Sequence, residues 1–238
     1  MRLHALALGA ALNAALAAGA PAQAGTLAIH HGDANPTGEG WTVNSYSGSS
    51  TGPVLDGGIP AWSLRGANYS TVLPFAILGP VATQGWVLTM IARSVDSGVN
   101  YPTTAARFYP GIRGWSVWLG NRANGDAFVL LLSAEPFSIP PGPSGPSYTM
   151  TGDPAAYHRF DLVCPPASAT ASLYVDGILR IADHPGYTHA WRPGFLLFGS
   201  SDPVGEARFH HVELRVGSEL PVPAEAGSWG ALKAHYRD

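Results

Sequence analysis

A set of aromatic and basic side chains in the middle of the chain could bind a sugar, because aromatic rings stack on the apolar faces of pyranosides. If residues 113–119 form a strand, Trp115 and Trp118 point to opposite sides, and Trp118 looks outward when Trp115 faces the core. The predicted carbohydrate contacts are Arg107, Tyr109, Arg113, Trp118, Asn121, Tyr187 and Trp191. The alternative is structural, since sandwich cores and loop lids use Trp and Tyr heavily.

Glycoside cleavage on a sheet would need a different pattern, and that pattern is missing. A retaining glycosidase uses two carboxyl groups about 5–5.5 Å apart, one as nucleophile and one as acid. Residues two positions apart on a strand share a face, so two acidic residues at that spacing would suit the distance. No glutamate has an acidic residue within two positions; the glutamates are Glu39, Glu135, Glu206, Glu213, Glu219 and Glu225. We assign no catalytic residue, and only a pair assembled from different strands stays open.

The segment from His210 to Glu213 contains groups that could bind a metal or act as a general base. On a regular strand one face would carry Phe209, His211, Glu213 and Arg215, and the other would carry Val212, Leu214 and Val216. The favoured interpretation is a polar ladder on a solvated outer face, with the valines and leucine in the core. A second pair, His30-His31, is expected on an edge strand or in a loop.

Three aspartates lie in segments rich in Gly, Pro and Ser, where a calcium ion could be held by carboxylate and carbonyl oxygens. They are Asp56, Asp183 and Asp202, and none shows the Asp-x-Asp-x-Asp spacing of an ion-binding loop. Capping of turns is the simpler explanation. Calcium is therefore a possible ligand, and no other cofactor is indicated.

The elements that position these groups are predicted to be short strands. Apolar residues recur with period two in runs bounded by Gly and Pro, which is typical of strands. The runs are 40–44, 61–64, 71–78, 85–93, 113–119 and 127–133, with four more between 157 and 217, while 45–58, 140–146 and 183–193 are expected to be loops. Before residue 220, no segment after the leader shows the length and period of a helix. The prediction is an all-β fold, a two-sheet antiparallel β-sandwich of the jelly-roll kind.

The dipeptide Asp176-Gly177 predicts a tight hairpin. Asp-Gly between two strands is the signature of a type I′ turn, in which both central residues take positive φ. This turn sets Val175 opposite Ile178 and Tyr174 opposite Leu179.

The first 24 residues are predicted to be a secretory signal peptide. Arg2 provides a positive start, an Ala- and Leu-rich stretch follows, and Ala22-Gln23-Ala24 is a small-x-small cleavage site. The apolar stretch is shorter than the roughly 20 residues that span a bilayer. We expect one domain over 25–219 with no transmembrane segment, followed by a C-terminal tail over 220–238 that is flexible or forms a short helix.

Composition excludes some partners. The leader contains one basic and no acidic residue, so 12 of the 13 basic side chains remain against 16 acidic ones. This balance argues against nucleic acid, which favours a basic face. Cys164 is the single cysteine, so no intramolecular disulfide can form, and it is expected to be a small buried apolar residue.

The segment from about 38 to 217 resembles the concanavalin A-like lectin/glucanase superfamily in its laminin G-like branch. The resemblance rests on Tyr157-His158, on A-S-L-Y-V-D-G over 171–177, on Phe198-Gly199-Ser200 and on Val212-Glu213-Leu214. It implies a lectin-like sandwich, a superfold that hosts lectins, hydrolases, lyases and adhesion modules. The ending W-G-A-L-K-A-H-Y-R resembles tails of exported bacterial proteins.

Taken together, these features predict an exported, non-catalytic lectin-like module that binds a glycan or a cell-surface partner outside the cytoplasm. One alternative is a glycosidase or polysaccharide lyase whose site is dispersed over several strands. Another is a structural or adhesive envelope protein in which the tail docks elsewhere.

Overall fold

The computed structural model describes residues 25–96, 104–121, 126–134, 144–150, 153, 156–189, 193–200 and 205–219. The expected signal peptide and C-terminal tail therefore lie outside the described residues, as do Trp191 and Asp202. In the described part of the chain, no helix has the length and apolar character needed to cross a membrane.

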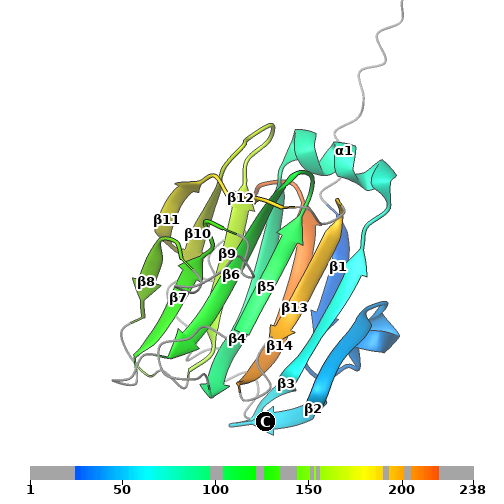
Figure 1. Ribbon diagram of the computed structural model, residues 1–238, viewed down its shortest axis with the longest axis vertical. Coiled ribbons are helices and arrows are strands. Elements are labelled where there is room, and N and C mark those ends of the chain that lie inside the picture. The colour runs from blue at the N-terminus through cyan, green and yellow to red at the C-terminus, as the bar shows by residue number, and fades with distance from the viewer. Residues whose placement is uncertain are drawn as a thin grey trace, which may run out of the picture.

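The described residues form an antiparallel β-sandwich, which confirms the predicted all-β class (Figure 1). The strands are β1 (Thr26–His31), β2 (Thr42–Asp56), β3 (Ile59–Val72), β4 (Trp86–Asp96), β5 (Thr104–Tyr109), β6 (Arg113–Asn121), β7 (Ala127–Leu131), β8 (Ser147–Thr149), β9 (His158–Cys164), β10 (Ala171–Val175), β11 (Ile178–His184), β12 (Tyr187–Thr188), β13 (Phe195–Ser200) and β14 (Glu206–Val216). A 3₁₀ turn, η1 (Pro36–Glu39), and one helix, α1 (Phe75–Gln84), complete the described elements.

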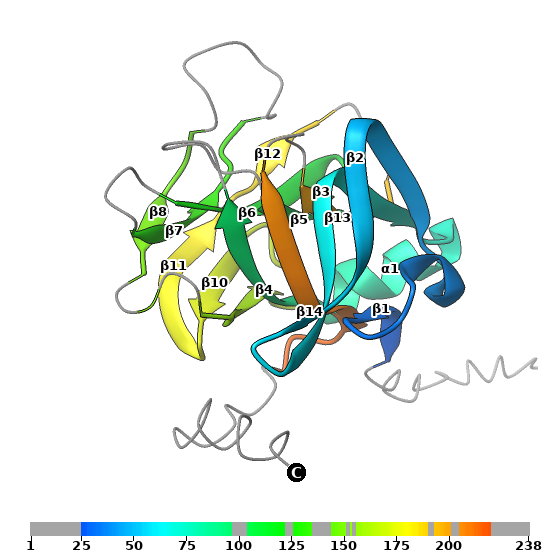
Figure 2. The ribbon, with the colours of Figure 1, turned by 90° about the horizontal axis from the view of Figure 1, so that it is seen from below.

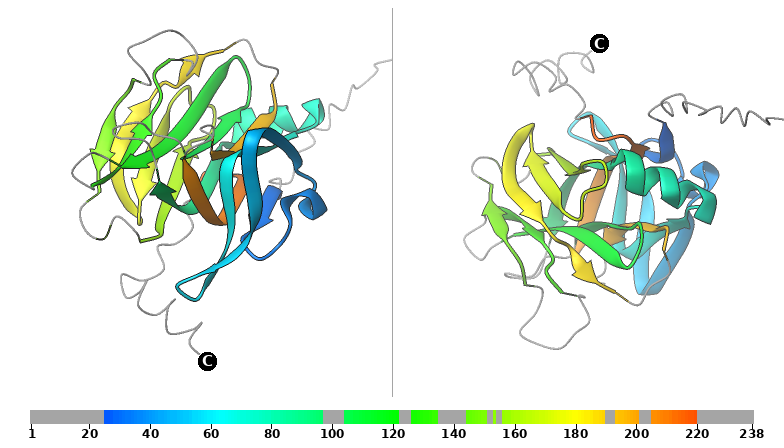
Figure 3. Two further views of the ribbon diagram at one scale, coloured as in Figure 1. Left: turned by 60° about the horizontal axis from the view of Figure 1, so that its bottom comes forward. Right: turned by 90° about the horizontal axis from the view of Figure 1, so that it is seen from above.

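Two layers face each other across a single main core (Figures 1 and 2). The front layer contains β3, β13, β5, β6 and β7, and the back layer contains β1, β14, β4, β9, β10 and β11. β14 joins the layers, because it pairs with both β3 and β4. The helix α1 carries the chain from the front layer to the back layer at one end of the sandwich (Figure 3).

The phase of two central strands was predicted correctly. On β4 the core side chains include Trp86, Leu88 and Met90, and on β6 they include Trp115 and Val117, as alternation requires. The Asp176-Gly177 hairpin is also confirmed, with φ of 51° and 77° at its two central residues. Its register pairs Val175 with Ile178 and Tyr174 with Leu179.

The expected strand over 71–78 is wrong. β3 ends at Val72, and α1 begins after Pro74, whose φ of −56° suits a helix start. Leu78 and Val81 are buried at a spacing of three residues, so this apolar segment packs as a helix. Gly85, with φ of 78°, ends it.

The expected loop over 45–58 is also wrong, because most of it belongs to a long hairpin of β2 and β3. Asp56 pairs with Ile59, and Gly57 and Gly58 make the turn with φ of 61° and 88°. β2 pairs with β3 alone and most of its described side chains are partly or fully exposed, so it shows little hydrophobic alternation. An edge strand of this kind reads in sequence as a polar loop.

Cys164 is buried, as expected, and its environment makes it unreactive. Burial raises the pKa of its thiol to about 11, so the nucleophilic thiolate is scarce at neutral pH.

Candidate functional site

Four of the predicted sugar-contact residues meet on the outer side of the front layer. Tyr109 of β5, Trp118 of β6 and Tyr187 of β12 belong to a second hydrophobic cluster. The Arg107 guanidinium carbon lies 4.7 Å from the Trp118 ring centroid, and the Tyr109 and Tyr187 hydroxyls are 2.8 Å apart. All four side chains are buried, with exposed fractions of 2–7%. Trp118 therefore points away from the main core, as predicted from the strand, but none of these rings has an exposed face on which a sugar could stack.

Of the other predicted contacts, Arg113 and Asn121 lie at opposite ends of β6. An Arg113 Nη1 donates to the carbonyl of Pro185 at 2.7 Å, which fixes a loop. Trp191 lies outside the described residues.

The calcium candidates are used in other ways. Asp56 accepts hydrogen bonds from Arg93 at 2.6 and 2.9 Å and lies 2.7 Å from Arg208, so its oxygens already have cationic partners. Asp183 is the second-last residue of β11, with a φ of 49°, and its backbone N–H donates to the Ser172 hydroxyl oxygen. Asp202 is not described. Among the described residues, no three His, Cys, Asp or Glu side chains gather in a way that could hold a metal.

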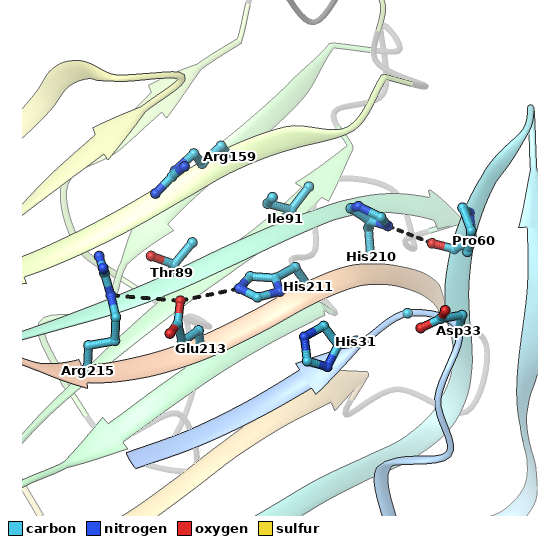
Figure 4. A pocket seen from close by; sticks show the side chains of 11 residues that line it. His31, Asp33, Pro60, Thr89, Ile91, Arg159, His210, His211, Glu213 and Arg215 are labelled. Carbon is cyan, nitrogen blue, oxygen red and sulfur yellow. Dashed lines mark hydrogen bonds and ion pairs between the residues drawn. The ribbon is translucent and has the colours of Figure 1, made fainter. Parts of the chain in front are cut away.

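An open pocket of about 480 Å³ lies on the opposite face, over the outer side of the back layer (Figure 4). Its floor crosses four neighbouring strands, β1, β14, β4 and β9. Eight of its eleven lining residues have polar side chains, and the lining consists of His31, Gly32, Asp33, Pro60, Thr89, Ile91, Arg159, His210, His211, Glu213 and Arg215. Such a volume lies within the roughly 300–1,000 Å³ typical of small-ligand pockets.

A β-bulge in β14 shapes one wall of this pocket. Phe209 pairs with Ala92 and His211 with Ile91, so His210 is an extra residue. A bulge of this kind shifts the alternation by one, and both His210 and His211 line the pocket. The expectation that Phe209 shares the outer face is wrong for this reason, because Phe209 is buried in the core.

The sequence did contain a signal for the bulge. Buried apolar residues of β14 recur every second position except between Phe209 and Val212, which are three positions apart. A single spacing of three inside a period-two run marks an inserted residue. The expected polar ladder of His211, Glu213 and Arg215 is present, and it forms part of the pocket floor.

Gly32 allows the bulge to pack against the chain after β1. Its N–H donates to the His210 carbonyl at 2.8 Å. A Cβ at this position would lie 2.6 Å from the Pro60 carbonyl oxygen and 2.9 Å from the His210 Cα, both backbone atoms that cannot rotate away.

Gly32→Ala should therefore lower the free energy of unfolding by about 1–3 kcal/mol, the usual cost of overpacking. Urea denaturation followed by circular dichroism would measure it. Gly38→Ala is the matched control, since a Cβ there meets no atom within 4 Å. Equal stability of the two variants would contradict this account of the bulge.

Glu213 is the central acceptor of the pocket. Its Oε1 accepts from the Thr26 hydroxyl at 2.6 Å. Its Oε2 lies 3.5 Å from His211 Nε2 and 3.7 Å from Arg215 Nε. Neither the Nε nor the Nη2 of Arg215 makes a hydrogen bond within the described structure. Arg215 is thus held near Glu213 with these two buried nitrogens not hydrogen-bonded within the described structure.

Asp161 lies next to the pocket, and its hydrogen bonds are already made. It is buried in β9 and accepts from the Thr89 hydroxyl at 2.7 Å and from Arg159 at 2.7 and 3.1 Å. Thr89 pairs with Glu213 on one side and with Asp161 on the other. These two carboxylates are thus a pair drawn from different strands, but the oxygens of Asp161 are already occupied by Thr89 and Arg159.

The histidines beside the pocket are oriented by carboxylates. His31 Nδ1 lies 3.0 Å from Glu39 Oε1, and the buried His30 Nδ1 lies 2.7 Å from Glu39 Oε2. Burial alone would raise the pKa of Glu39, but hydrogen bonds from His30 and His31 outweigh it and hold that pKa below its usual range. Burial lowers the pKa of His211, an effect that Glu213 partly opposes. His30 and His31 lie on β1, an edge strand of the described sheet, as expected.

The sequence matches no known protein-family profile and no curated protein. Solved structures share the fold. One is the carbohydrate esterase vb_24B_21 of the Shiga toxin-encoding bacteriophage phi24B, with a TM-score of 0.58 and 10% identity over 82% of this chain and 100% of that one. Another is domain 4 of AbnA, a GH43 extracellular arabinanase from Geobacillus stearothermophilus in complex with arabinotriose, with a TM-score of 0.51 and 12% identity over 83% and 95% of the two chains.

A third similar structure belongs to botulinum neurotoxin type C, whose cell entry depends on interaction with two ganglioside molecules. Its TM-score is 0.50 and its identity 9% over 82% of this chain, which spans about half (49%) of the neurotoxin chain. At these identities the comparisons show the fold alone, a β-sandwich of a kind found in proteins of carbohydrate recognition and processing.

Proposed function

We propose that the protein is a carbohydrate-binding module of the concanavalin A-like, laminin G type, and that the pocket on the back layer is its binding site. The observation that carries this proposal is an open pocket of about 480 Å³ with a floor of mixed donors and acceptors. Sugar hydroxyls both donate and accept, so they match a surface on which arginine and histidine nitrogens lie beside a carboxylate.

The charges of the lining favour an uncharged ligand at neutral pH. Arg159 and Arg215 are balanced by Glu213 and Asp33 when the histidines are neutral. A charged ligand would therefore meet a like charge as well as an opposite one, whereas hydroxyl groups can bond to both. The sandwich shared with a domain that was solved with arabinotriose supports this choice of ligand class.

Binding without cleavage is supported by the state of the carboxylates. A glycosidase needs one carboxyl group that holds a proton at its working pH and one that is free to act as base or nucleophile. Asp161 is buried and is not part of the pocket lining, and its oxygens already accept hydrogen bonds from Arg159 and Thr89. The module is proposed to act outside the cytoplasm, on the strength of the predicted signal peptide.

The predicted role of Arg107, Tyr109, Trp118 and Tyr187 stays a prediction. These side chains would have to be uncovered before a sugar could stack on them, since all are buried. The back-layer pocket requires no such movement, and we assign the site there.

A glycan array followed by isothermal titration calorimetry tests the assignment. Glu213→Ala should weaken binding of any array-positive glycan by about 10- to 100-fold, because hydrogen bonds to charged groups contribute about 1.5–3 kcal/mol. Glu219→Ala is the control, since Glu219 is exposed and outside the pocket. Release of reducing sugar from the bound glycan would instead favour the dispersed-site enzyme. Unchanged affinity in a folded Glu213→Ala protein would refute this site.

A further inference from the structure

The pocket contains two histidine rings that lie side by side on neighbouring strands. His31 of β1 pairs with His211 of β14, and their ring centroids are 5.8 Å apart (Figure 4). Both line the pocket, and the His31 side chain is 54% exposed, so a ligand can reach this pair without any rearrangement.

Each ring has one nitrogen turned to a carboxylate. His31 Nδ1 faces Glu39 at 3.0 Å, and His211 Nε2 faces Glu213 at 3.5 Å. An ionised carboxylate can only accept, so the nitrogen that faces it carries the proton in the neutral ring. The remaining nitrogens, His31 Nε2 and His211 Nδ1, are therefore acceptors while the rings are neutral.

Protonation reverses the polarity of both remaining nitrogens. An imidazolium donates from each nitrogen and accepts from neither. Glu39 and Glu213 keep their contacts in either state, so the change falls on the nitrogens that do not face them. Acid thus converts two acceptors into two cationic donors at the same place.

The surroundings of the pair allow this change. His210 and Arg215 flank His211 on β14, Arg159 faces it from β9, and Asp33 follows His31. Thr89 and Ile91 on β4 do not titrate. Burial lowers the pKa of His211, Glu213 opposes this, and His31 and His210 lower it further, so His211 gains its proton below the ordinary value of 6.5.

We propose that His31 and His211 form one subsite that accepts hydrogen bonds from sugar hydroxyls when neutral and donates to the carboxylate of an acidic sugar when protonated. The proposal rests on the proposed function and names the ligand group at that site in each state. At a pH where the His31 and His211 rings are neutral, the module recognises neutral sugars. At a lower pH where they are protonated, the module also binds uronic acids through the two imidazolium rings and Arg215.

An array of matched oligosaccharides tests the subsite. Each neutral glycan, with cellotriose as the reference, is printed beside its C6-oxidised uronate counterpart and probed at pH 7.5 and pH 5.0. Neutral signals should fall by about three- to tenfold in acid, the size of one or two lost hydrogen bonds, and uronate signals should rise by a similar factor. His31→Gln and His211→Gln should each flatten this profile. His158→Gln is the control, because His158 binds Asp176 and lies outside the pocket.

The outcomes separate the two proposals. No signal on any glycan at either pH removes the proposed function and this subsite with it. Neutral-glycan signals with the same strength at both pH values overturn the subsite and leave the proposed function standing. Long-range ¹H–¹⁵N spectra of the free protein add a check without ligand: the neutral rings should carry their protons on His31 Nδ1 and His211 Nε2, and the opposite tautomers would also overturn the subsite.

Discussion

Phe198→Ala should lower the free energy of unfolding by about 3–5 kcal/mol, the usual range for removing a buried aromatic ring from a core. Phe198 is fully buried on β13, where the two layers meet. Its ring centroid lies 4.8 Å from that of Trp41, 4.9 Å from His30 and 5.1 Å from Phe209. The substitution leaves a cavity between rings from three other strands or loops, and none of them can fill it by a simple rotation.

Guanidinium denaturation of both variants in parallel measures this effect. Phe75→Ala is the matched control, because Phe75 is 84% exposed at the start of α1 and should change stability by less than about 0.5 kcal/mol. If the two alanine variants unfolded at the same denaturant concentration, the assignment of Phe198 to the centre of the core would be wrong.

Asp56→Ala should cost about 3 kcal/mol, because it leaves the partly buried Arg93 without its ion-pair partner. The carboxylate accepts from Arg93 and from the Tyr157 hydroxyl and also contacts Arg208, so it ties the β2–β3 turn to β4 and β14. Arg208 keeps its ion pair with Glu206 at 2.9 Å, so the uncompensated charge is that of Arg93. Asp33→Ala is the control, since Asp33 is exposed and forms no ion pair within the described structure.

The contribution of the Asp56 carboxylate to the free energy of unfolding should depend on pH. Burial alone would raise the pKa of Asp56, but hydrogen bonds from Arg93 and Tyr157 and the charge of Arg208 outweigh it, so the pKa is lowered. A lowered folded-state pKa adds stability above the unfolded value of about 3.9 and loses it as the pH falls further. The stability difference between the wild-type protein and Asp56→Ala should therefore shrink as the pH falls below about 3.9. A constant difference between pH 7 and pH 3 would contradict this.

The phase of several strands could be predicted from the sequence, because side chains that face the main core recur at every second position. Trp115 and Val117 of β6 and the Val175–Ile178 pair follow this rule. The helix α1 and strand β2 could not, for opposite reasons. A short apolar run such as 75–81 fits a helix and a strand equally, whereas an edge strand with exposed side chains has no alternation to read.

The candidate site was harder to predict than the fold, since its residues come from four strands that are distant in sequence. His31 and Arg159 lie beside the polar ladder of β14 only because of the order of the strands in the sheet. Trp118 does point away from the main core, as predicted. The alternation of a strand does not reveal, however, whether other side chains bury its outer face, as they do here. At the bulge, one inserted residue shifts the alternation of β14, so Phe209 faces the core and not the outer surface as predicted.

The position of β14 has a consequence for how this chain acquires its structure during synthesis. β14 is the last described strand, yet it pairs with β1, with residues 62–65 of β3 and with most of β4. More than 200 residues must therefore be synthesised before β1 can pair with β14. Contacts of such sequence separation slow folding. β1 therefore lacks its strand partner in the described structure until residues 206–216 have been synthesised.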